Sequence, residues 1–209
     1  MYTLYWSHGA ASLAVHFCLE ESGARYETKL VDMAQNAHRS AEYLKINPSG
    51  KIPTLMVDGN FAMTESAAIC MLIADRHPEA KLAPAANDMK RGHYYMWLTY
   101  LTNTLQPAML RYYYQDRITT AIAETRGIED KAREEIAAIW NLIDTHLKAY
   151  GPYLLGDQFS AADAFCYMLS TWQRCCPDAY GRFPSLKRLA DRVSARPAIG
   201  RILQVNRAV

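Results

Sequence analysis

The sequence lacks three features that would each point to a class of partner. Lys and Arg outnumber Asp and Glu by only two, 23 against 21, so the net charge does not favour a nucleic acid or an anionic membrane. No apolar run approaches the ~20 residues of a membrane-spanning helix, and no basic start with an apolar core marks a secretory signal. We therefore expect a cytoplasmic protein with neither nucleic acid nor membrane as partner.

The five cysteines also lack the spacing of a metal site, because no C-x-x-C pair or Cys/His ligand pattern occurs. Cys18, Cys70 and Cys166 fall within predicted helices, where a buried cysteine packs as a small apolar side chain. Cys175 and Cys176 are adjacent. They are either two reduced thiols or a vicinal disulfide. We expect no bound metal.

The N-terminal part of the chain alternates between strand and helix signals. Apolar and β-prone runs predict strands, and the Asp58-Gly59 pair predicts a hairpin between the last two. Helical periodicity fills the intervening segments. The expected strands are 2–6, 26–31, 54–57 and 61–63, and the expected helices are 10–22, 40–44 and 64–77. This order predicts parallel pairing in the first half and an antiparallel hairpin at one edge.

The stretch PEAKLAPAAN at 78–87 has no periodicity and contains two prolines, which predicts a linker at 79–87. It separates an α/β domain, residues 1–78, from an all-helical domain, residues 88–209. The expected helices of the second domain are 88–115 with a kink at Pro107, 128–150, 160–174, 185–195 and 197–204.

The motif KIP at 51–53 places a proline at the start of an apolar strand. One solution is a cis Ile52-Pro53 bond in a sharp turn, which would leave the Ile52 backbone free to pair with an extended ligand. The alternative is an ordinary trans proline at a strand start.

The motif TES at 64–66 begins a helix, with Thr64 as its expected N-cap. Free N–H groups and the positive helix end attract anions there, so Ser66 could hold a ligand carboxylate and Glu65 an ammonium group. Simple helix capping is the alternative. A third motif, GDQFSAAD at 156–163, predicts a structural capping pair of Ser160 and Asp163.

Taken together, four segments resemble the glutathione S-transferase superfamily over essentially the whole chain. They are LYWSHGAASLAVHFCLEESG, NPSGKIPTL, MTESAAICMLIAD and GDQFSAADAF. Each segment alone is weakly specific, whereas their order and spacing are specific. The beginning of the chain is most similar to bacterial beta-type members.

The resemblance implies a thioredoxin-like domain that binds glutathione and a helical domain that lines the pocket for a hydrophobic substrate. Ile52, before a cis Pro53, would pair with the cysteinyl backbone of glutathione. Glu65 and Ser66 would hold its γ-glutamyl end. His38 or Lys51 would reach its glycyl carboxylate, with a solvated surface role as the alternative for each. Family members are usually homodimers.

The loop SHGAAS at 7–12 departs from the family pattern. Ala11 stands where beta-type members carry cysteine, and Ala10 stands about where other members carry serine. A mixed disulfide with glutathione at this loop is therefore excluded. A thiol with a pKa of ~8.5 still needs a hydrogen-bond donor to ionise at neutral pH. The candidates, in order, are Ser12, Ser7, Tyr5 and His8, with the backbone N–H groups of Ala11 and Ser12 beside them.

The resemblance also places two polar residues of the long helix near the thiol. Thr99 and Gln106 stand where beta-type members carry asparagine and histidine, and Gln106 can still donate to sulfur. The run RYYYQDR at 111–117 follows the Pro107 kink and is expected to line the pocket of the second substrate. Helix packing is the alternative for at least two of its tyrosines. The expected pocket residues are Arg111, Tyr112, Tyr114 and Trp172, with Arg174 at the border.

The sequence therefore predicts a glutathione transferase that adds the glutathione thiolate to apolar electrophiles. Two alternatives stay open. One is a glutathione-dependent dehalogenase, ether-cleaving enzyme, isomerase or peroxidase, which would share the first domain and differ in the pocket. The other is a non-catalytic binding protein or stress regulator, which the alanines at 10 and 11 make credible.

Overall fold

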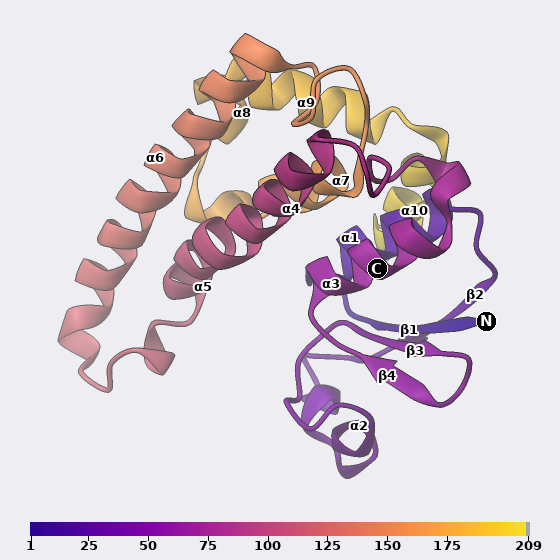
Figure 1. The fold of residues 1–209 in the computed structure, drawn as a ribbon. Coiled ribbons are helices and arrows are strands. Elements are labelled where there is room, and N and C mark those ends of the chain that lie inside the picture. The colour runs from indigo at the N-terminus through magenta and orange to yellow at the C-terminus, as the bar shows by residue number, and fades with distance from the viewer. Residues whose placement is uncertain (208–209) are drawn as a thin grey trace. The chain divides into compact units, whose positions relative to one another are not determined.

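The computed structural model describes residues 1–207 and divides the chain into two compact units. Unit 1 contains residues 1–86 together with the chain from Val193 onward, and unit 2 contains residues 87–192. Unit 1 is an α/β structure and unit 2 is helical (Figure 1). The predicted combination of a thioredoxin-like domain and an all-helical domain is confirmed.

Unit 1 is built on a four-stranded sheet in the order β2-β1-β3-β4. Its strands are β1 (Tyr2–Trp6), β2 (Tyr26–Leu30), β3 (Thr54–Val57) and β4 (Phe61–Met63). β1 and β2 are parallel, whereas β3 is antiparallel to both of its neighbours. Asp58 and Gly59, in the turn between β3 and β4, both have positive φ. The predicted hairpin and the predicted parallel pairing of the first two strands are therefore confirmed.

Helices cover both faces of this sheet (Figure 1). α1 (Ser12–Glu21) and α3 (Ser66–Arg76) pack against each other on one face, and α2 (Ala41–Ile46) lies on the other. Alternate residues of β1 explain the two faces: Tyr2, Leu4 and Trp6 are buried. Apolar side chains of α1 and α3 complete that core.

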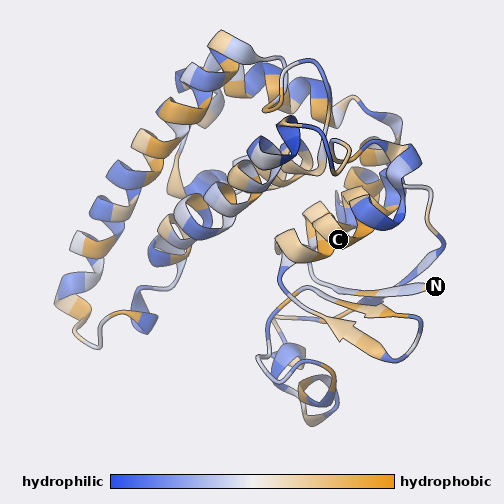
Figure 2. Cartoon of the chain, viewed as in Figure 1, coloured by the Kyte–Doolittle hydropathy of each residue, from blue (hydrophilic) through white to orange (hydrophobic). Residues whose placement is uncertain are grey.

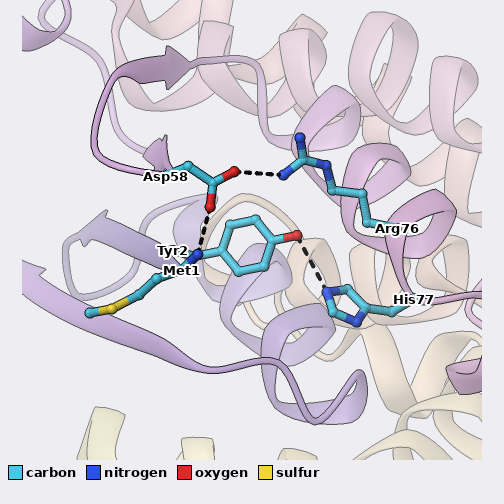
Figure 3. Close-up of polar contacts among 5 residues, drawn as sticks. All are labelled: Met1, Tyr2, Asp58, Arg76 and His77. Carbon is cyan, nitrogen blue, oxygen red and sulfur yellow. Dashed lines mark hydrogen bonds and ion pairs between the residues drawn. The ribbon is translucent and has the colours of Figure 1, made fainter.

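Polar contacts close one end of this sheet (Figure 3). The Asp58 carboxylate accepts a hydrogen bond from the Met1 amino group at 2.6 Å and lies 3.5 Å from the Arg76 guanidinium. The Tyr2 hydroxyl is 3.3 Å from Nε2 of His77. The start of β1, the β3–β4 turn and the end of α3 are thus held together, largely by exposed charges that each contribute little.

The last helix, α10 (Pro197–Arg207), packs against α1 within unit 1. The Arg196 guanidinium donates two hydrogen bonds of 2.7 Å to the Glu21 carboxylate, and Arg201 donates one of 2.7 Å to Glu20. The Glu21 side chain is only 10% exposed, so this bidentate pair is partly shielded from water. The expected helical domain ended at 209, but the chain from Val193 onward clusters with unit 1 because α10 docks on α1.

Unit 2 contains six α-helices among the residues described. They are α4 (Lys90–Tyr100), α5 (Gln106–Tyr113), α6 (Thr125–Tyr150), α7 (Ala161–Ser170), α8 (Ala179–Arg182) and α9 (Pro184–Ser194). A π-helical segment, Leu101–Leu105, joins α4 to α5. The long helix expected to kink at Pro107 is therefore continuous, with a change from α- to π-helical geometry just before that residue. In Figure 2, both hydrophilic and hydrophobic colours recur along α6. None of the helices described is long and apolar enough to span a membrane.

Some expected boundaries were wrong. Helix α3 begins at Ser66 with Glu65 as its N-cap, not with Thr64. Helix α7 ends at Ser170 rather than near Arg174, and a short 3₁₀ turn, Gln173–Cys175, follows it. The hydroxyls of Ser170 and Thr171 donate to the Tyr167 and Met168 carbonyls, which satisfies acceptors at the helix end. The short helix α8 was missed.

The N-terminus of α7 is a buried polar cluster, as the GDQFSAAD motif predicts. The Asp163 carboxylate accepts hydrogen bonds from the Leu154 N–H at 2.7 Å, the Ser160 N–H at 2.8 Å and the Ser160 hydroxyl at 2.9 Å. Burial raises the pKa of Asp163 to about 6, against the opposing effect of these hydrogen bonds. Asp163 therefore connects the preceding loop to the helix.

A second buried cluster holds the loop that enters β3. The Lys51 carbonyl oxygen accepts from the Tyr43 hydroxyl at 2.7 Å and from Nδ2 of Asn47 at 2.8 Å. Both donors also reach Oγ1 of Thr54, at 2.8 and 3.0 Å. Oδ1 of Asn47 accepts from the N–H and hydroxyl of Ser49. Asn47 thus bridges both ends of the loop, whose shape depends on it. We name this group, Tyr43, Asn47 and Thr54, the loop clamp.

Replacing Asp163 with Ala should lower the free energy of unfolding by about 2–4 kcal/mol, because three buried donors lose their acceptor. Asp157→Ala, at an exposed carboxylate four residues before α7, should stay within about 0.5 kcal/mol of wild type. Urea unfolding of the full chain measures both. A loss in Asp163→Ala as small as that in Asp157→Ala would contradict the assigned role.

The same residue predicts a pH dependence. Because the folded pKa of Asp163 lies above its unfolded value, its contribution to stability rises as the pH falls from about 6 towards 4, by up to about 1.4 kcal/mol per pH unit. The difference in unfolding free energy between wild type and Asp163→Ala should therefore grow over that interval. A difference that shrinks as the pH falls would refute this.

Asn47→Ala should destabilise unit 1 by about 2 kcal/mol, because the Ser49 and Lys51 groups lose their buried partner. Asn60→Ala, in the exposed β3–β4 turn, is the matched control and should change stability by less than about 0.5 kcal/mol. Chemical unfolding followed by circular dichroism compares the two. Equal stability of the two variants would show that the loop clamp contributes nothing.

Candidate active site

The register of the sheet brings three chain segments together at one end of unit 1. Tyr5 pairs with Thr54 across β1 and β3, and Leu55 pairs with Met63 across β3 and β4. Continued past the strand ends, the same register sets Ser7 opposite Ile52, and Pro53 opposite Glu65. The predicted glutathione-binding segments of unit 1 therefore meet at the end of three adjacent strands.

The middle segment carries the expected cis Ile52-Pro53 bond, which the structure confirms. Pro53 is buried and Ile52 is half-buried. Within residues 1–207, neither the N–H nor the C=O of Ile52 makes a hydrogen bond. The preceding carbonyl, that of Lys51, is fixed by the loop clamp. Ile52 therefore presents one backbone donor and one acceptor from a rigid loop, as strand-like pairing with a peptide requires.

The next segment is the start of α3, where Glu65 has φ +63° and ψ +101°. A residue with a Cβ in this region costs of order 1–3 kcal/mol, and such residues cluster at functional sites. Glu65 is exposed, whereas Ser66 is 8% exposed, and its hydroxyl has no partner among the residues described. The first N–H groups of this 11-residue helix add partial positive charge. The turn can therefore receive a carboxylate beside a free anionic side chain.

The third segment is the SHGAAS loop, where the structure changes the order of the candidate donors. The Ser12 hydroxyl, 1% exposed, donates to the Ser7 carbonyl at 3.1 Å and accepts from the Ser7 N–H at 3.2 Å. Its proton is thus already engaged by the loop. The Ser7 hydroxyl makes no hydrogen bond within residues 1–207. Ser12 therefore positions Ser7, and these hydrogen bonds favour the Ser7 hydroxyl over that of Ser12 as the candidate donor.

The other two candidate donors pack against neighbouring rings. Tyr5 faces α2, with its ring centroid 6.0 Å from that of Tyr43 and 5.5 Å from Nζ of Lys29. The His8 ring lies 4.7 Å from that of Trp6 in a T-shaped contact, and its buried Nδ1 has no partner among the residues described. Tyr5 therefore contributes to sheet packing, and His8 caps the ring of Trp6.

His38 and Lys51 come from two adjacent segments. His38 is half-buried in a 3₁₀ turn, Ala37–Arg39, and Lys51 is exposed. A Cβ on Gly50 would lie 3.0 Å from the His38 carbonyl oxygen and 2.9 Å from the Arg39 guanidinium. Both candidates therefore border one cationic loop, to which Arg39 also belongs. Sequence reasoning missed Arg39 and the loop clamp. The signal for the clamp was Asn47, four residues before Lys51 in NPSGKIP.

In unit 2, the predicted residues Gln106 and Arg111 lie on α5. Gln106 is the first residue of α5, half-buried and without a hydrogen-bond partner among the residues described. Arg111 pairs with Glu135 of α6 and lines a cavity of about 510 Å³ with Ile118, Ile128 and Lys131, among others. Arg111 is thus held at the α5–α6 contact.

The remaining pocket candidates lie around the end of α5. Tyr112 is buried and accepts a hydrogen bond of 2.9 Å from Arg133. The Tyr114 ring has the Arg117 guanidinium 3.8 Å from its centroid. The Trp172 ring packs edge-on against Tyr113, with centroids 6.2 Å apart. Tyr113, which was not among the predicted pocket residues, therefore connects Trp172 to α5.

Comparisons with known proteins identify the family of the chain. The family model described as "Glutathione S-transferase, N-terminal domain" matches residues 10–76, and the one described as "Glutathione S-transferase, C-terminal domain" matches residues 122–204. Glutathione S-transferase GST-4.5 of Xanthomonas campestris pv. campestris is 30% identical over 169 residues, which cover 81% of each chain.

Two solved structures extend the similarity to three dimensions. A glutathione transferase homologue from Sulfitobacter, with bound glutathione, is 25% identical, with a TM-score of 0.91 and 98% of each chain covered. A bacterial beta class glutathione S-transferase of Sphingomonas chungbukensis is 27% identical, with a TM-score of 0.85, and covers 99% of this chain and 100% of its own. The chain is an enzyme of the glutathione S-transferase family.

Proposed function

We propose that this protein binds glutathione at the end of the unit 1 sheet and adds its thiolate to electrophiles whose reacting part is apolar. The observation that carries the proposal is the meeting of Ser7, Ile52-Pro53 and Glu65-Ser66 at one sheet end. A tripeptide thiol needs a backbone partner, an α-amino acid site and a sulfur-facing donor, and these three segments offer one each.

Each part of glutathione has a chemically matched partner. The cysteinyl N–H and C=O pair with the free backbone groups of Ile52. The γ-glutamyl carboxylate accepts from the Ser66 hydroxyl and the first N–H groups of α3, and Glu65 receives the ammonium group. The glycyl carboxylate meets the cationic loop formed by His38, Arg39 and Lys51.

The sulfur of glutathione performs the nucleophilic attack, so the protein has to stabilise a thiolate. The proposed donor is the Ser7 hydroxyl, with Ser12 holding the Ser7 backbone in place. Free N–H groups at the start of α1 add to the positive potential there. A donor and a helix N-terminus both favour the charged form of a thiol, which lowers its pKa. Gln106 is a further donor to sulfur that the resemblance suggests.

The helical unit supplies the acceptor pocket in this proposal, with Arg111, Tyr112, Tyr114 and Trp172 among its residues. A homodimer is proposed on the same resemblance, and light scattering of the purified chain tests it.

Ser66→Ala should weaken glutathione binding by about tenfold, because one hydrogen bond to a carboxylate is lost. Isothermal titration calorimetry measures the affinity, and turnover of chlorodinitrobenzene measures the conjugation. Wild type should bind and turn over. No heat of binding with wild type would refute the proposed function, and binding without turnover would favour a binding protein instead.

Ser7→Ala should raise the pKa of the bound glutathione thiol by about one unit, the value of one hydrogen bond to the thiolate. Ser7→Thr, which keeps the hydroxyl, should stay near wild type. The ultraviolet absorbance of the thiolate, titrated against pH, reports the pKa. Ser66→Ala serves as the matched control, since it should change the affinity and leave that pKa in place. An unchanged pKa in Ser7→Ala would transfer the role to Gln106 or to the backbone N–H groups.

A further inference from the structure

The proposed reaction gives no role to Tyr113, Arg133 and Arg174, which belong to a wall of aromatic rings and guanidinium groups formed by five side chains of unit 2. They come from the end of α5, from α6 and from the turn after α7, and are Tyr112, Tyr113, Arg133, Trp172 and Arg174. We call them the arginine–tyrosine wall. Both α5 and α6 pack against the 3₁₀ turn that carries Arg174.

The rings of the wall are held in fixed orientations. Tyr112 and Tyr113 are in T-shaped contact, with centroids 5.1 Å apart, and Tyr113 meets Trp172 at an interplanar angle of 88°. The Tyr113 hydroxyl donates to the Trp172 carbonyl at 3.2 Å, and the Cys175 thiol donates to the same oxygen at 2.9 Å. The Trp172 carbonyl oxygen thus connects the turn to α5, and the Cys175 thiol contributes a hydrogen bond to the same oxygen.

Guanidinium groups lie over two of the rings. The guanidinium carbon of Arg133 is 4.7 Å from the Tyr112 centroid, and that of Arg174 is 5.8 Å from the Tyr113 centroid. Both distances fall within the ~6 Å range of cation–π contact. Arg133 also donates to the Tyr112 hydroxyl. That leaves most of its five N–H donors available.

Neither arginine has a carboxylate partner within residues 1–207, whereas Arg111, Arg196 and Arg201 each have one. The positive charge of Arg133 also acts on a nearby thiol. Burial raises the pKa of the Cys176 thiol, and the Asp178 carboxylate raises it further. The positive charges of Arg182 and Arg133 act in the opposite direction and lower it. Arg133 and Arg174 are therefore two cations without a carboxylate partner among the described residues, and both lie against aromatic rings.

An aromatic surface favours a flat apolar ring, and unpaired guanidinium groups favour a carboxylate, which they can bind with two parallel hydrogen bonds. We propose that the electrophile is an aromatic acid, whose ring packs on Tyr113 and Trp172 while its carboxylate pairs with Arg174 and Arg133. This inference rests on the proposed function, and it specifies the class of acceptor.

With a chlorinated aromatic acid, the proposed reaction is a nucleophilic substitution on the aromatic ring. The glutathione thiolate attacks the ring carbon that bears chlorine, a C–S bond forms, and chloride leaves with the electron pair of the C–Cl bond. No oxidant or reductant takes part. The carboxylate of the acceptor stays unchanged and serves recognition alone.

The first experiment measures binding without turnover, so that its outcome does not depend on the proposed reaction. Dinitrobenzoate and dinitrobenzene are titrated into the full chain without glutathione, so that no thiolate is present to react, while tryptophan fluorescence is followed. Wild type should bind the acid more tightly, and Arg174→Gln should reduce the ratio of the two affinities by about tenfold. Added salt should also reduce the ratio, since Arg174 is exposed.

The second experiment compares kcat/KM for chlorodinitrobenzene and its carboxylated analogue, chlorodinitrobenzoate. The ratio should favour the acid in wild type and fall in Arg174→Gln and Arg133→Gln. Arg192→Gln, at an exposed arginine of α9, is the matched control and should keep the wild-type ratio. Loss of turnover with both acceptors, but not of the binding preference, would count against the proposed function only. Equal affinity of wild type for the acid and the neutral compound, or an unchanged ratio in Arg174→Gln, would overturn the inference.

Discussion

The antiparallel pairing of β3 with both β1 and β4 determines where the candidate site residues of unit 1 lie. This one short strand of four residues sets the register of its two neighbours, and the loop that enters it lies at the same end of the sheet as the loops that leave β1 and β4. A shift by one residue would turn every side chain of β3 to the other face and separate Ile52 from Ser7 and Glu65. Buried Leu55 and Val57 oppose such a shift, because it would bring them to the other face of the sheet. The hydrophobic core thus fixes the geometry of the polar site.

Local patterns in the sequence were sufficient for the strands, the hairpin and the buried capping pair. β-prone residues mark β1, Asp58-Gly59 marks the turn, and Ser160 with Asp163 marks the start of α7, all of which depend on neighbouring residues. The docking of α10 on α1 depends on Arg196 and Glu21, which are far apart in the chain, so no local pattern contained it.

In the candidate site, too, some features could be predicted from neighbouring residues and others could not. The segments SHGAAS, KIP and TES were found from their residues, whereas the state of each hydroxyl was not. Ser12 and Ser7 look equivalent in a sequence, and only the hydrogen bonds between them show that one is engaged and the other is not. The backbone angle of Glu65 could not be read from its identity either, since glutamate rarely adopts positive φ. In unit 2, the tyrosine run was visible, but its guanidinium neighbours come from α6 and from the turn after α7.

The return of the chain to unit 1 has a consequence for its synthesis. Unit 2 is inserted between the first 86 residues and the helix that completes the first unit. While the ribosome is still making unit 2, the face of α1 that later receives α10 has no covering partner, and Glu20 and Glu21 have not yet met their arginines. Unit 2 contains all of its own helices and can be complete earlier. The nascent chain therefore carries unit 2 as a complete insert within an incomplete unit 1 until α10 has been made, and unit 1 is the later of the two to be completed.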